Sequence, residues 1–484
     1  MTLLIIDIGS SSVRALLFDH DARPIDEAMT RTPYQFTTTP PGAATVEAEQ
    51  LREMVEQCLD KLLDHPAAQS IEAVGMATFV GNVLGIDKDG QPVTPVFTYA
   101  DLRSAEYVDR LRGQIDLEAA HQRTGCLLHT AYLPARLAWL RETQPDVWTK
   151  VHQWIDLGAY LYRTWFGDAP SSYSVASWSG LLDRARLTWD AEWLRVLGLP
   201  AEQFPVLGDY SDAQHGLQAA YAERWPSLRD VPFYLAIGDG AAANVGVGAV
   251  EAGQIALTIG TTAALRVVTQ AELPDVPSGL WSYRVDRAHH LIGGATTEGG
   301  NIFQWAQSTL RLDDQQAIEQ HLAKAAPDGH GLTFLPLLAG ERSPGWATNA
   351  TGSINGLRLS TVPMDILQAA LEGVALRLSL IADQLRAITG DAPTVLTGGG
   401  ALDASPAWAQ IVANALNRPL RMLTTAETTA RGVAVLVLSH LKRRSLSAFA
   451  LAVSHEVTPQ PEHVAVLRNA RDRQQEQYAK LVSR

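Results

Sequence analysis

The chain has 484 residues, of which 46% are hydrophobic and 19% charged, and its formal net charge is −13. This length exceeds what one hydrophobic core supports, so it predicts two large domains. The negative charge repels nucleic acid and acidic membrane surfaces, and we expect neither as a partner. The two cysteines form neither a metal motif nor a disulfide framework, and the apolar run at the start is too short for a signal or membrane segment. We therefore expect a cytoplasmic enzyme.

The first predicted element is a hairpin, with a buried strand at 3–8, a Gly-Ser-Ser-Ser turn at 9–12 and a second strand at 13–18. Glycine lets the backbone approach an anion closely, and the hydroxyl and N–H groups around it donate to phosphate oxygens. Asp7 at the strand end is interpreted as a Mg²⁺ ligand or as a cap of the turn. Arg14 on the returning strand is positioned either for phosphate or for a surface ion pair.

The next part of the chain alternates between helices and strands, which is typical of an α/β fold. The predicted elements are helix 47–63, strands 73–77 and 83–87, helices 100–113, 133–142 and 157–165, and a loop-rich stretch at 171–203.

A strand at 233–237 then leads into Gly238-Asp239-Gly240 and a helix of small residues at 241–247. The small neighbours leave room for a ligand at the Asp239 carboxylate, and a helix N-terminus favours the anion. Asp239 is interpreted as a general base for a substrate hydroxyl or as a plain N-cap.

A second hairpin repeats the pattern of the first, with a strand at 255–259, a Gly-Thr-Thr turn at 260–262 and a strand at 263–268. We place the domain boundary near Gly248, which gives domains 1–247 and 248–484. Two such turns facing each other across a cleft would hold a nucleotide triphosphate from both sides.

The remaining elements include a helix at 363–388, whose continuous apolar stripe predicts a core helix, and an exposed C-terminal helix at 463–484. A strand at 394–397 ends at three glycines, which predict either close approach of a flat ligand such as adenine or a tight turn. Glu341 and Arg342 form an acid–base pair in a loop, interpreted as a structural contact between lobes rather than as a substrate site.

Taken together, these segments resemble the FGGY family of carbohydrate kinases, within the actin-like ATPase superfamily. The segments that carry the resemblance are Asp7–Arg14, Asp101-Leu102-Arg103, Gly238-Asp239-Gly240, Gly260-Thr261-Thr262, Gly340-Glu341-Arg342-Ser343-Pro344, Gly352–Leu357 and Gly398-Gly399-Gly400. The resemblance implies an α/β fold with two ribonuclease-H-like domains around a central cleft.

The resemblance also implies a role for each matching residue. Asp239 would be the catalytic base, and Asp7 and Asp239 would hold Mg²⁺. The implied nucleotide-binding residues are Gly9, Ser10, Ser11, Ser12, Arg14, Gly260, Thr261, Thr262, Gly300, Gln304, Gly399, Gly400 and Asp403. The implied substrate residues are Thr78, Val80, Gly81, Asp101, Arg103 and Asp239.

The implied activity is ATP-dependent phosphorylation of a sugar, sugar acid or polyol hydroxyl, with ATP and Mg²⁺ as cofactors. A gluconate-like substrate is slightly favoured; the alternatives are a xylulokinase-type ketose kinase and a non-catalytic ATP-binding carbohydrate sensor. Val80 and Gly81 stand where family members carry sugar-binding groups, and Arg136 stands where a lysine is common. A homodimer is compatible with the resemblance.

Overall fold

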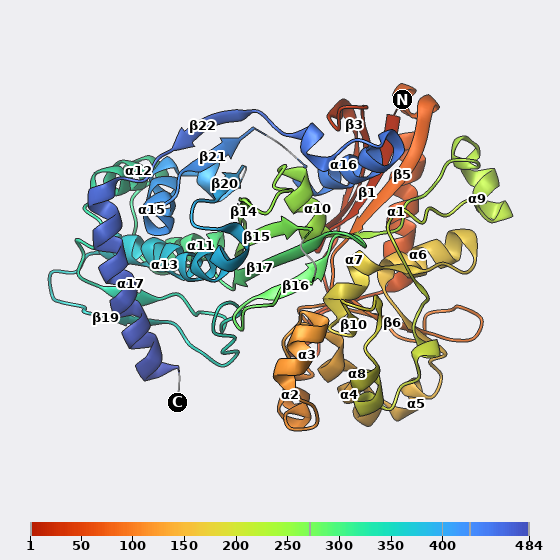
Figure 1. The fold of residues 1–484 in the computed structure, drawn as a ribbon, viewed down its shortest axis with the longest axis horizontal. Helices are drawn as coiled ribbons and strands as arrows, with labels where there is room; N and C mark the ends of the chain where they lie inside the picture. Colours follow the sequence, from red (N-terminus) through yellow and green to blue (C-terminus); the bar gives the residue numbers. More distant parts are fainter. Residues whose placement is uncertain (1, 271–272, 399, 425–426, 483–484) are drawn as a thin grey trace.

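The computed structural model describes residues 2–270, 273–398, 400–424 and 427–482. Two separate β-sheets, each covered by helices, lie along the long axis of the molecule (Figure 1). Both hairpins predicted from the glycine turns are present, one in each sheet. The boundary near Gly248 stays a prediction. Among the described helices, none is both long and apolar enough to span a membrane.

The first sheet has the strand order β13-β5-β1-β2-β3. Its strands are β1 (Thr2–Ile8), β2 (Ser12–Phe18), β3 (Pro24–Pro33), β5 (Ile71–Thr78) and β13 (Ile237–Gly238). Strands β1, β5 and β13 are parallel, and their register places Asp7, Ala77 and Ile237 in one row. The carboxyl ends of these strands therefore meet at one edge of the sheet.

Helices from both halves of the chain cover the first sheet. Helices α1 (Ala48–Leu63) and α6 (Leu157–Phe166) pack on β2, β3 and β5. Helices α10 (Asp239–Gly246) and α16 (Thr428–Lys442) pack against each other, and both contact β5. Although α16 lies late in the sequence, Figure 1 shows it beside β1 and β5. Helix α10 also contacts the second sheet, so Asp239 stands where the two sheets approach each other.

The second sheet has the strand order β16-β17-β15-β14-β20-β21-β22. Its strands are β14 (Gln254–Ile259), β15 (Ala263–Thr269), β16 (Trp281–Arg284), β17 (His290–Thr296), β20 (Thr394–Thr397), β21 (Leu420–Leu423) and β22 (Val453–Val457). The long helix α13 packs on β15 and β17, which confirms the predicted core helix. The helices of this domain are α11 (Gly300–Thr309), α12 (Gln315–Lys324), α13 (Pro363–Thr389), α14 (Ala401–Ala404), α15 (Pro406–Leu416) and α17 (Pro461–Leu481), beside the small sheet β18 (Thr333–Leu335) and β19 (Ser353–Asn355).

An accessory layer of short helices and two-residue to three-residue strands lies at the bottom of Figure 1. Its helices are α2 (Ala105–Leu111), α3 (Leu117–Thr124), α4 (Leu133–Thr143), α5 (Pro145–Trp148), α7 (Tyr173–Ala176) and α8 (Ala191–Leu197), while α9 (Ala219–Arg224) lies apart from them at the right. Its strand pairs are β4 (Thr45–Val46) with β7 (Val96–Phe97), β6 (Leu84–Ile86) with β8 (Gln153–Ile155), β9 (Ser171–Ser172) with β12 (Leu207–Gly208), and β10 (Leu182–Asp183) with β11 (Thr188–Trp189).

Two predicted elements were too long. The helix expected over residues 100–113 spans only α2, because the Asp101 carboxylate accepts hydrogen bonds from Ala44 N and Arg103 N and holds the preceding residues in a turn. The strand expected over 233–237 is reduced to β13. Tyr234 N still donates to Val74 of β5, but Leu235 N donates to Tyr210 in a loop, which interrupts the ladder.

Candidate active site

Asp7 is the penultimate residue of β1, at the edge where the carboxyl ends of the parallel strands meet, and only 1% of it is exposed. Its carboxylate forms an ion pair with Arg14 on β2, and Arg14 forms a second ion pair with Glu427. Glu427 immediately precedes α16, so this chain of charges joins the two halves of the sequence. Burial raises the pKa of Asp7 to about 6, although the Arg14 charge opposes that shift.

Asp239 begins α10 at the same edge, directly after β13, and is partly exposed. Its Oδ1 accepts the Gly240 N–H at 2.7 Å, and in the described part of the chain no donor reaches Oδ2. Burial raises the pKa of Asp239 to about 6. The Asp7 carboxylate adds to this shift, whereas the Gly240 N–H and the Arg266 guanidinium oppose it. Asp239 thus combines an open carboxylate oxygen with a pKa near neutrality.

Arg266 on β15 is a site residue that sequence reasoning missed. Its Nη1 donates to Thr258 Oγ1 at 3.0 Å, and its buried Nε has no hydrogen-bond partner among the residues that the structure describes. A Cβ atom at Gly240 would lie 3.8 Å from that Nε, which places the guanidinium beside the base. Burial lowers the pKa of Arg266 to about 10, and Asp239 opposes the shift. Arg266 lies on the returning strand of the second hairpin, as Arg14 lies on that of the first, and this correspondence is the sequence signal that it offered.

The two glycine turns are accessible, as phosphate binding requires. Gly9 N donates to Ser12 O at 3.0 Å, and Gly260 N donates to Thr262 O at 2.9 Å. The residues enclosed by these two hydrogen bonds, Ser10 and Ser11 in the first turn and Thr261 in the second, are exposed. Each turn therefore closes on itself and presents its hydroxyl groups outward.

The start of α11 is built against the second turn. Gly300 N donates to Gly260 O at 2.6 Å, and a Cβ atom at Gly300 would lie only 2.7 Å from that same oxygen. At Gly299, a Cβ atom would lie 2.4 Å from the Thr262 carbonyl carbon. Only glycine fits both positions without displacing the turn, so the helix N-terminus and the turn form one unit.

The third glycine cluster approaches this unit from β20. A Cβ atom at Gly400, whose φ is +69°, would lie 2.7 Å from Ile259 O at the end of β14. Gln304 and Asp403 are exposed on neighbouring helices. Gly399 lies outside the described residues. The structure thus brings Gly300 and Gly400 to the same end of β14, while the nucleotide roles of all these residues stay predictions.

The predicted substrate segment begins at Thr78, the last residue of β5. Two polar groups in this region, one on Thr78 and one on Trp178, are buried. Thr78 pairs with Gly238 of β13, and no described residue forms a hydrogen bond with its buried Oγ1. Val80 and Trp178 both crowd Gly238, since a Cβ atom there would lie 2.8 Å from Val80 Cγ1 and from Trp178 Nε1. The buried Trp178 Nε1 likewise lacks a hydrogen-bond partner within the described ranges of the chain. Two potential hydrogen-bonding groups therefore adjoin Asp239.

Aromatic rings form one wall beside these groups. Trp178 stacks on Tyr283 with ring centroids 3.6 Å apart, and Tyr283 stacks on Trp281 at 4.4 Å. Tyr34 lies on the side of the first turn, where its hydroxyl donates to Gly9 O at 2.5 Å. Burial raises the pKa of Tyr34, and the Asp239 charge contributes. Trp178 was not identified from the sequence.

Asp101 and Arg103 are paired with each other. Arg103 donates to both oxygens of Asp101, the shortest bond being 2.6 Å from Nη2 to Oδ2, and its guanidinium lies 4.6 Å from the Trp139 ring centroid. Gly81 has φ +66°, and its carbonyl accepts from the buried Arg136 at 2.8 Å. Arg136 also binds two other loop carbonyls, so it fixes the backbone of the accessory layer. The substrate roles of Asp101, Arg103 and Gly81 stay predictions.

Two other charged groups lie outside this site. Glu341 forms an ion pair with Arg377 of α13 and accepts from Tyr478 of α17, so its contacts stay within the second domain and the expected contact between lobes was wrong for Glu341. Within the described residues, Asp328, His330 and Glu372 lie close enough together to hold a metal ion, but the two ring nitrogens of His330 are already engaged. His330 Nε2 lies 3.2 Å from Glu372, and its Nδ1 accepts from Leu332 N.

Comparisons with known proteins assign this two-domain α/β structure to a protein family. Residues 2–246 match the N-terminal domain of the FGGY family of carbohydrate kinases, and residues 255–440 match its C-terminal domain. The chain belongs to this family, and it is an ATP-dependent carbohydrate kinase. The predicted family, fold class and enzyme class are confirmed.

Three relatives illustrate the likeness. A gluconokinase of Bacillus subtilis (strain 168) is 25% identical over 447 residues, covering 90% of this chain and 87% of the relative. A xylulose kinase of Escherichia coli (strain K12) is 26% identical over 415 residues, with 84% of each chain covered. The crystal structure of gluconate kinase from Lactobacillus acidophilus superposes with a TM-score of 0.91 at 24% identity, covering 99% of this chain and 98% of the other.

Proposed function

We propose that this kinase transfers the terminal phosphoryl group of ATP to a hydroxyl of a sugar acid of the gluconate type. The observation that carries the proposal is the position of Arg266, whose guanidinium lies beside Asp239 with a buried, unpaired Nε. A guanidinium pairs with a carboxylate through two parallel hydrogen bonds, whereas a neutral sugar would supply weaker acceptors. The gluconokinase relative supports the same substrate class.

Asp239 is the proposed general base. Its pKa of about 6 leaves it mainly ionised at pH 7, and its Oδ2 is open to a substrate hydroxyl. Phosphoryl transfer proceeds through a loose transition state, so the protein chiefly positions the hydroxyl and accepts its proton. The unpaired Thr78 hydroxyl and Trp178 indole N–H are suited to orient other hydroxyls of the same substrate.

The residues present fit ATP and Mg²⁺. The accessible turns at 9–12 and 260–262, with the start of α11, offer hydroxyl and N–H groups to phosphates. Asp7 and Asp239 offer carboxylate oxygens, the ligand type that Mg²⁺ prefers. Because burial raises the pKa of both carboxyls, a nearby cation would stabilise their ionised forms. When bound, Mg²⁺ would neutralise charge on the phosphates.

The second candidate substrate is a ketose such as xylulose. The unpaired donors beside Asp239 suit any polyhydroxylated chain, and a xylulose kinase is among the relatives. The proposal also includes a cytoplasmic location, where ATP is available. It further includes assembly as a homodimer. The sensor hypothesis lacks support, since the family consists of kinases and Asp239 is present.

The test is a substrate panel with purified enzyme, ATP and MgCl₂. Gluconate, xylulose and glycerol are compared by ADP release, and the phosphorylated products are identified by mass spectrometry. The proposal expects kcat/KM for gluconate to exceed that for both neutral substrates at least tenfold. A preference for xylulose or glycerol would overturn the sugar-acid assignment while leaving the kinase intact. ADP release without any phosphorylated sugar would overturn the proposed acceptor class altogether.

A further inference from the structure

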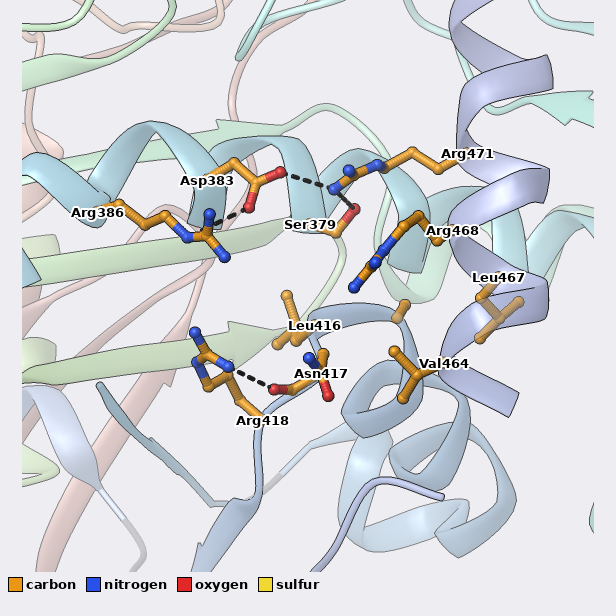
Figure 2. Close-up of a pocket in the computed structure, with 11 residues that line it drawn as sticks. Ser379, Asp383, Arg386, Leu416, Asn417, Arg418, Val464, Leu467, Arg468 and Arg471 are labelled. Atoms are coloured by element: carbon orange, nitrogen blue, oxygen red, sulfur yellow. Dashed lines mark hydrogen bonds and ion pairs between the residues drawn. The ribbon is translucent and has the colours of Figure 1, made fainter. Parts of the chain in front are cut away.

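A cavity of about 270 Å³ lies in the second domain, between α13, α15 and α17 (Figure 2). Four arginines line it, and they come from three separate parts of the chain. Arg386 belongs to α13, Arg418 follows α15, and Arg468 and Arg471 belong to α17. Figure 2 shows the Arg468 side chain extending from α17 into the pocket, between Arg471 and the turn that carries Asn417.

The positive charge of this pocket is only partly neutralised. Among the described residues that line the pocket, Asp383 is the single carboxylate. Its Oδ2 lies 2.7 Å from Arg471 Nη1, and its Oδ1 lies 3.7 Å from Arg386 Nε. Arg418 donates to backbone carbonyls, one of them Asn417 O at 2.8 Å. In the part of the chain that the structure describes, Arg468 has neither a hydrogen bond nor an ion pair. Four cations thus face one anion, in a chain whose net charge is −13.

Position near the end of a helix accounts for only two of the four arginines. Cations are stabilised near helix C-termini, and this accounts for Arg386 in the last turn of α13 and for Arg418 just beyond α15. Arg468 and Arg471 lie in the middle of α17, so the dipole of their own helix does not favour them, although their side chains face the pocket that the C-terminal turn of α15 also lines. Their convergence on the other two guanidinium groups raises mutual repulsion that a bound anion would offset.

The pocket is separate from the catalytic cleft. Helix α15 starts near Gly400, at the carboxyl end of β20, and runs back to Asn417 at the opposite edge of the sheet. Arg418 then leads into the amino end of β21, which is parallel to β20. The arginine pocket therefore lies at the edge of the second sheet away from the glycine turns. A ligand here would occupy a second site.

We propose that this arginine pocket binds a small anion that carries a phosphate group. Guanidinium forks match phosphate oxygens in pairs, and several forks around one cavity suit a group with more than one negative charge. The volume lies just below the usual range for small-ligand sites, so the ligand is compact. Nucleic acid is excluded by the size of the cavity and by the negative charge of the whole chain. The proposal is independent of the substrate assigned above.

The test compares full-length wild-type enzyme with the pocket variant Arg418→Ala/Arg468→Ala. A control variant, Arg112→Ala/Arg195→Ala, removes the same charge from exposed positions of the accessory layer. Inorganic phosphate, 6-phosphogluconate and ADP are titrated separately by calorimetry, with sodium chloride at equal ionic strength as the reference. Because the catalytic site is unchanged in both variants, any binding there cancels in the comparison.

The proposal expects at least one phosphate-bearing probe to bind the pocket variant tenfold or more weakly than the wild type and the control. Weaker binding of all three probes would show that the pocket recognises the phosphate group itself. Weaker binding of 6-phosphogluconate alone would indicate a sugar phosphate as the ligand, and weaker binding of ADP alone would indicate a nucleotide. Equal binding of every probe by all three proteins would overturn the site. The single variant Arg468→Gln, at an exposed position, repeats the test if the double variant fails to fold.

Discussion

Arg266 and Asp239 lie close enough for each to shift the pKa of the other, although one belongs to the second sheet and the other begins the helix beside the first. The proton affinity of the proposed base therefore depends on the contact between domains. Separation of the domains would remove the guanidinium, which lowers the pKa of Asp239, and would also hydrate the carboxylate, whose burial is the larger cause and raises the pKa. Domain closure and activation of the base are physically coupled by this pair.

Replacement of the base tests its role directly. Asp239→Asn keeps the shape of the side chain but cannot accept the proton, so kcat should fall about 10²–10⁴-fold. ATP affinity, measured by calorimetry, should stay within about threefold, because the turns that hold the phosphates are unchanged. Asp314→Asn, at the N-cap of α12, is the matched control and should keep full activity. Near-normal turnover by Asp239→Asn would remove Asp239 from the mechanism.

Arg266→Gln tests recognition of the carboxylate. Hydrogen bonds to charged groups contribute about 1.5–3 kcal/mol, so kcat/KM for gluconate should fall about 10–150-fold. For xylulose and glycerol it should fall much less, and Arg266→Lys should restore part of the loss. Rates are compared at pH 8, where Asp239 is ionised in both proteins. An equal fall for all three substrates would instead indicate that Arg266 contacts the transferred phosphate.

The pH dependence of the rate should reveal the raised pKa of the base. Asp239 must be ionised to accept a proton, so kcat/KM should be level above neutrality and fall about tenfold per pH unit below pH 6. Since Arg266 lowers the pKa of Asp239, the Arg266→Gln variant should show the same fall at a higher pH. The measurement is a rate profile from pH 4.5 to 8.5; an acid limb below pH 5 would contradict the raised pKa.

Thermal stability should depend on the same carboxyl group in the opposite direction: activity requires ionised Asp239, whereas the folded state is more stable when Asp239 is neutral. The pKa of Asp239 rises from 3.8 to about 6 on folding, so between these values the folded state binds more protons than the unfolded state. Stability contributed by the neutral form is therefore lost as the pH rises from about 4 to 6. Asp239→Asn is neutral throughout, and its Tm should exceed that of the wild type by about 1–3 °C at pH 8. A pKa rise of this size corresponds to at most roughly 3 kcal/mol, and a chain of 484 residues gains about 1 °C per kcal/mol. At pH 4 the two should agree; a less stable variant at pH 8 would contradict this account.

The packing of α11 against the second turn predicts a nucleotide defect. In Gly300→Ala, the new methyl group would meet Gly260 O at 2.7 Å and push the turn away, so KM for ATP should rise about tenfold or more. Gly253→Ala is the matched control, since its Cβ would meet nothing within 4 Å. The variants are compared by steady-state kinetics with ATP varied. Equal KM values would separate Gly300 from nucleotide binding.

Local patterns in the sequence predicted much of the fold. Both glycine hairpins, α13 and the helix that begins at Asp239 were identified, because apolar periodicity and turn residues act over a few neighbours. The helix over 100–113 and the strand over 233–237 were overextended because distant partners, Ala44 and Tyr210, set their limits.

The site was only partly predictable. Asp7 and Asp239 stood out because each carboxylate lies beside glycine after a strand, but Arg266 and Trp178 carry no such local mark. Their importance depends on unpaired buried atoms, which only the assembled structure reveals. The pairing of Asp101 with Arg103 was likewise invisible, since adjacency in sequence does not fix which way either side chain turns.

Helix α16 crosses from the second half of the chain to lie against the first sheet and α10. A Cβ atom on Gly75 would lie 2.5 Å from Val433 Cγ1, and a Cβ atom on Gly432 would lie 1.7 Å from Ala242 O. Division of the chain near Gly248 would consequently not give two fragments that each fold independently. The N-terminal fragment would bare the apolar surface of β5, and the C-terminal fragment would carry an apolar helix with nothing to rest on. Co-expression of the two fragments would let α16 cover the apolar surface of β5 again.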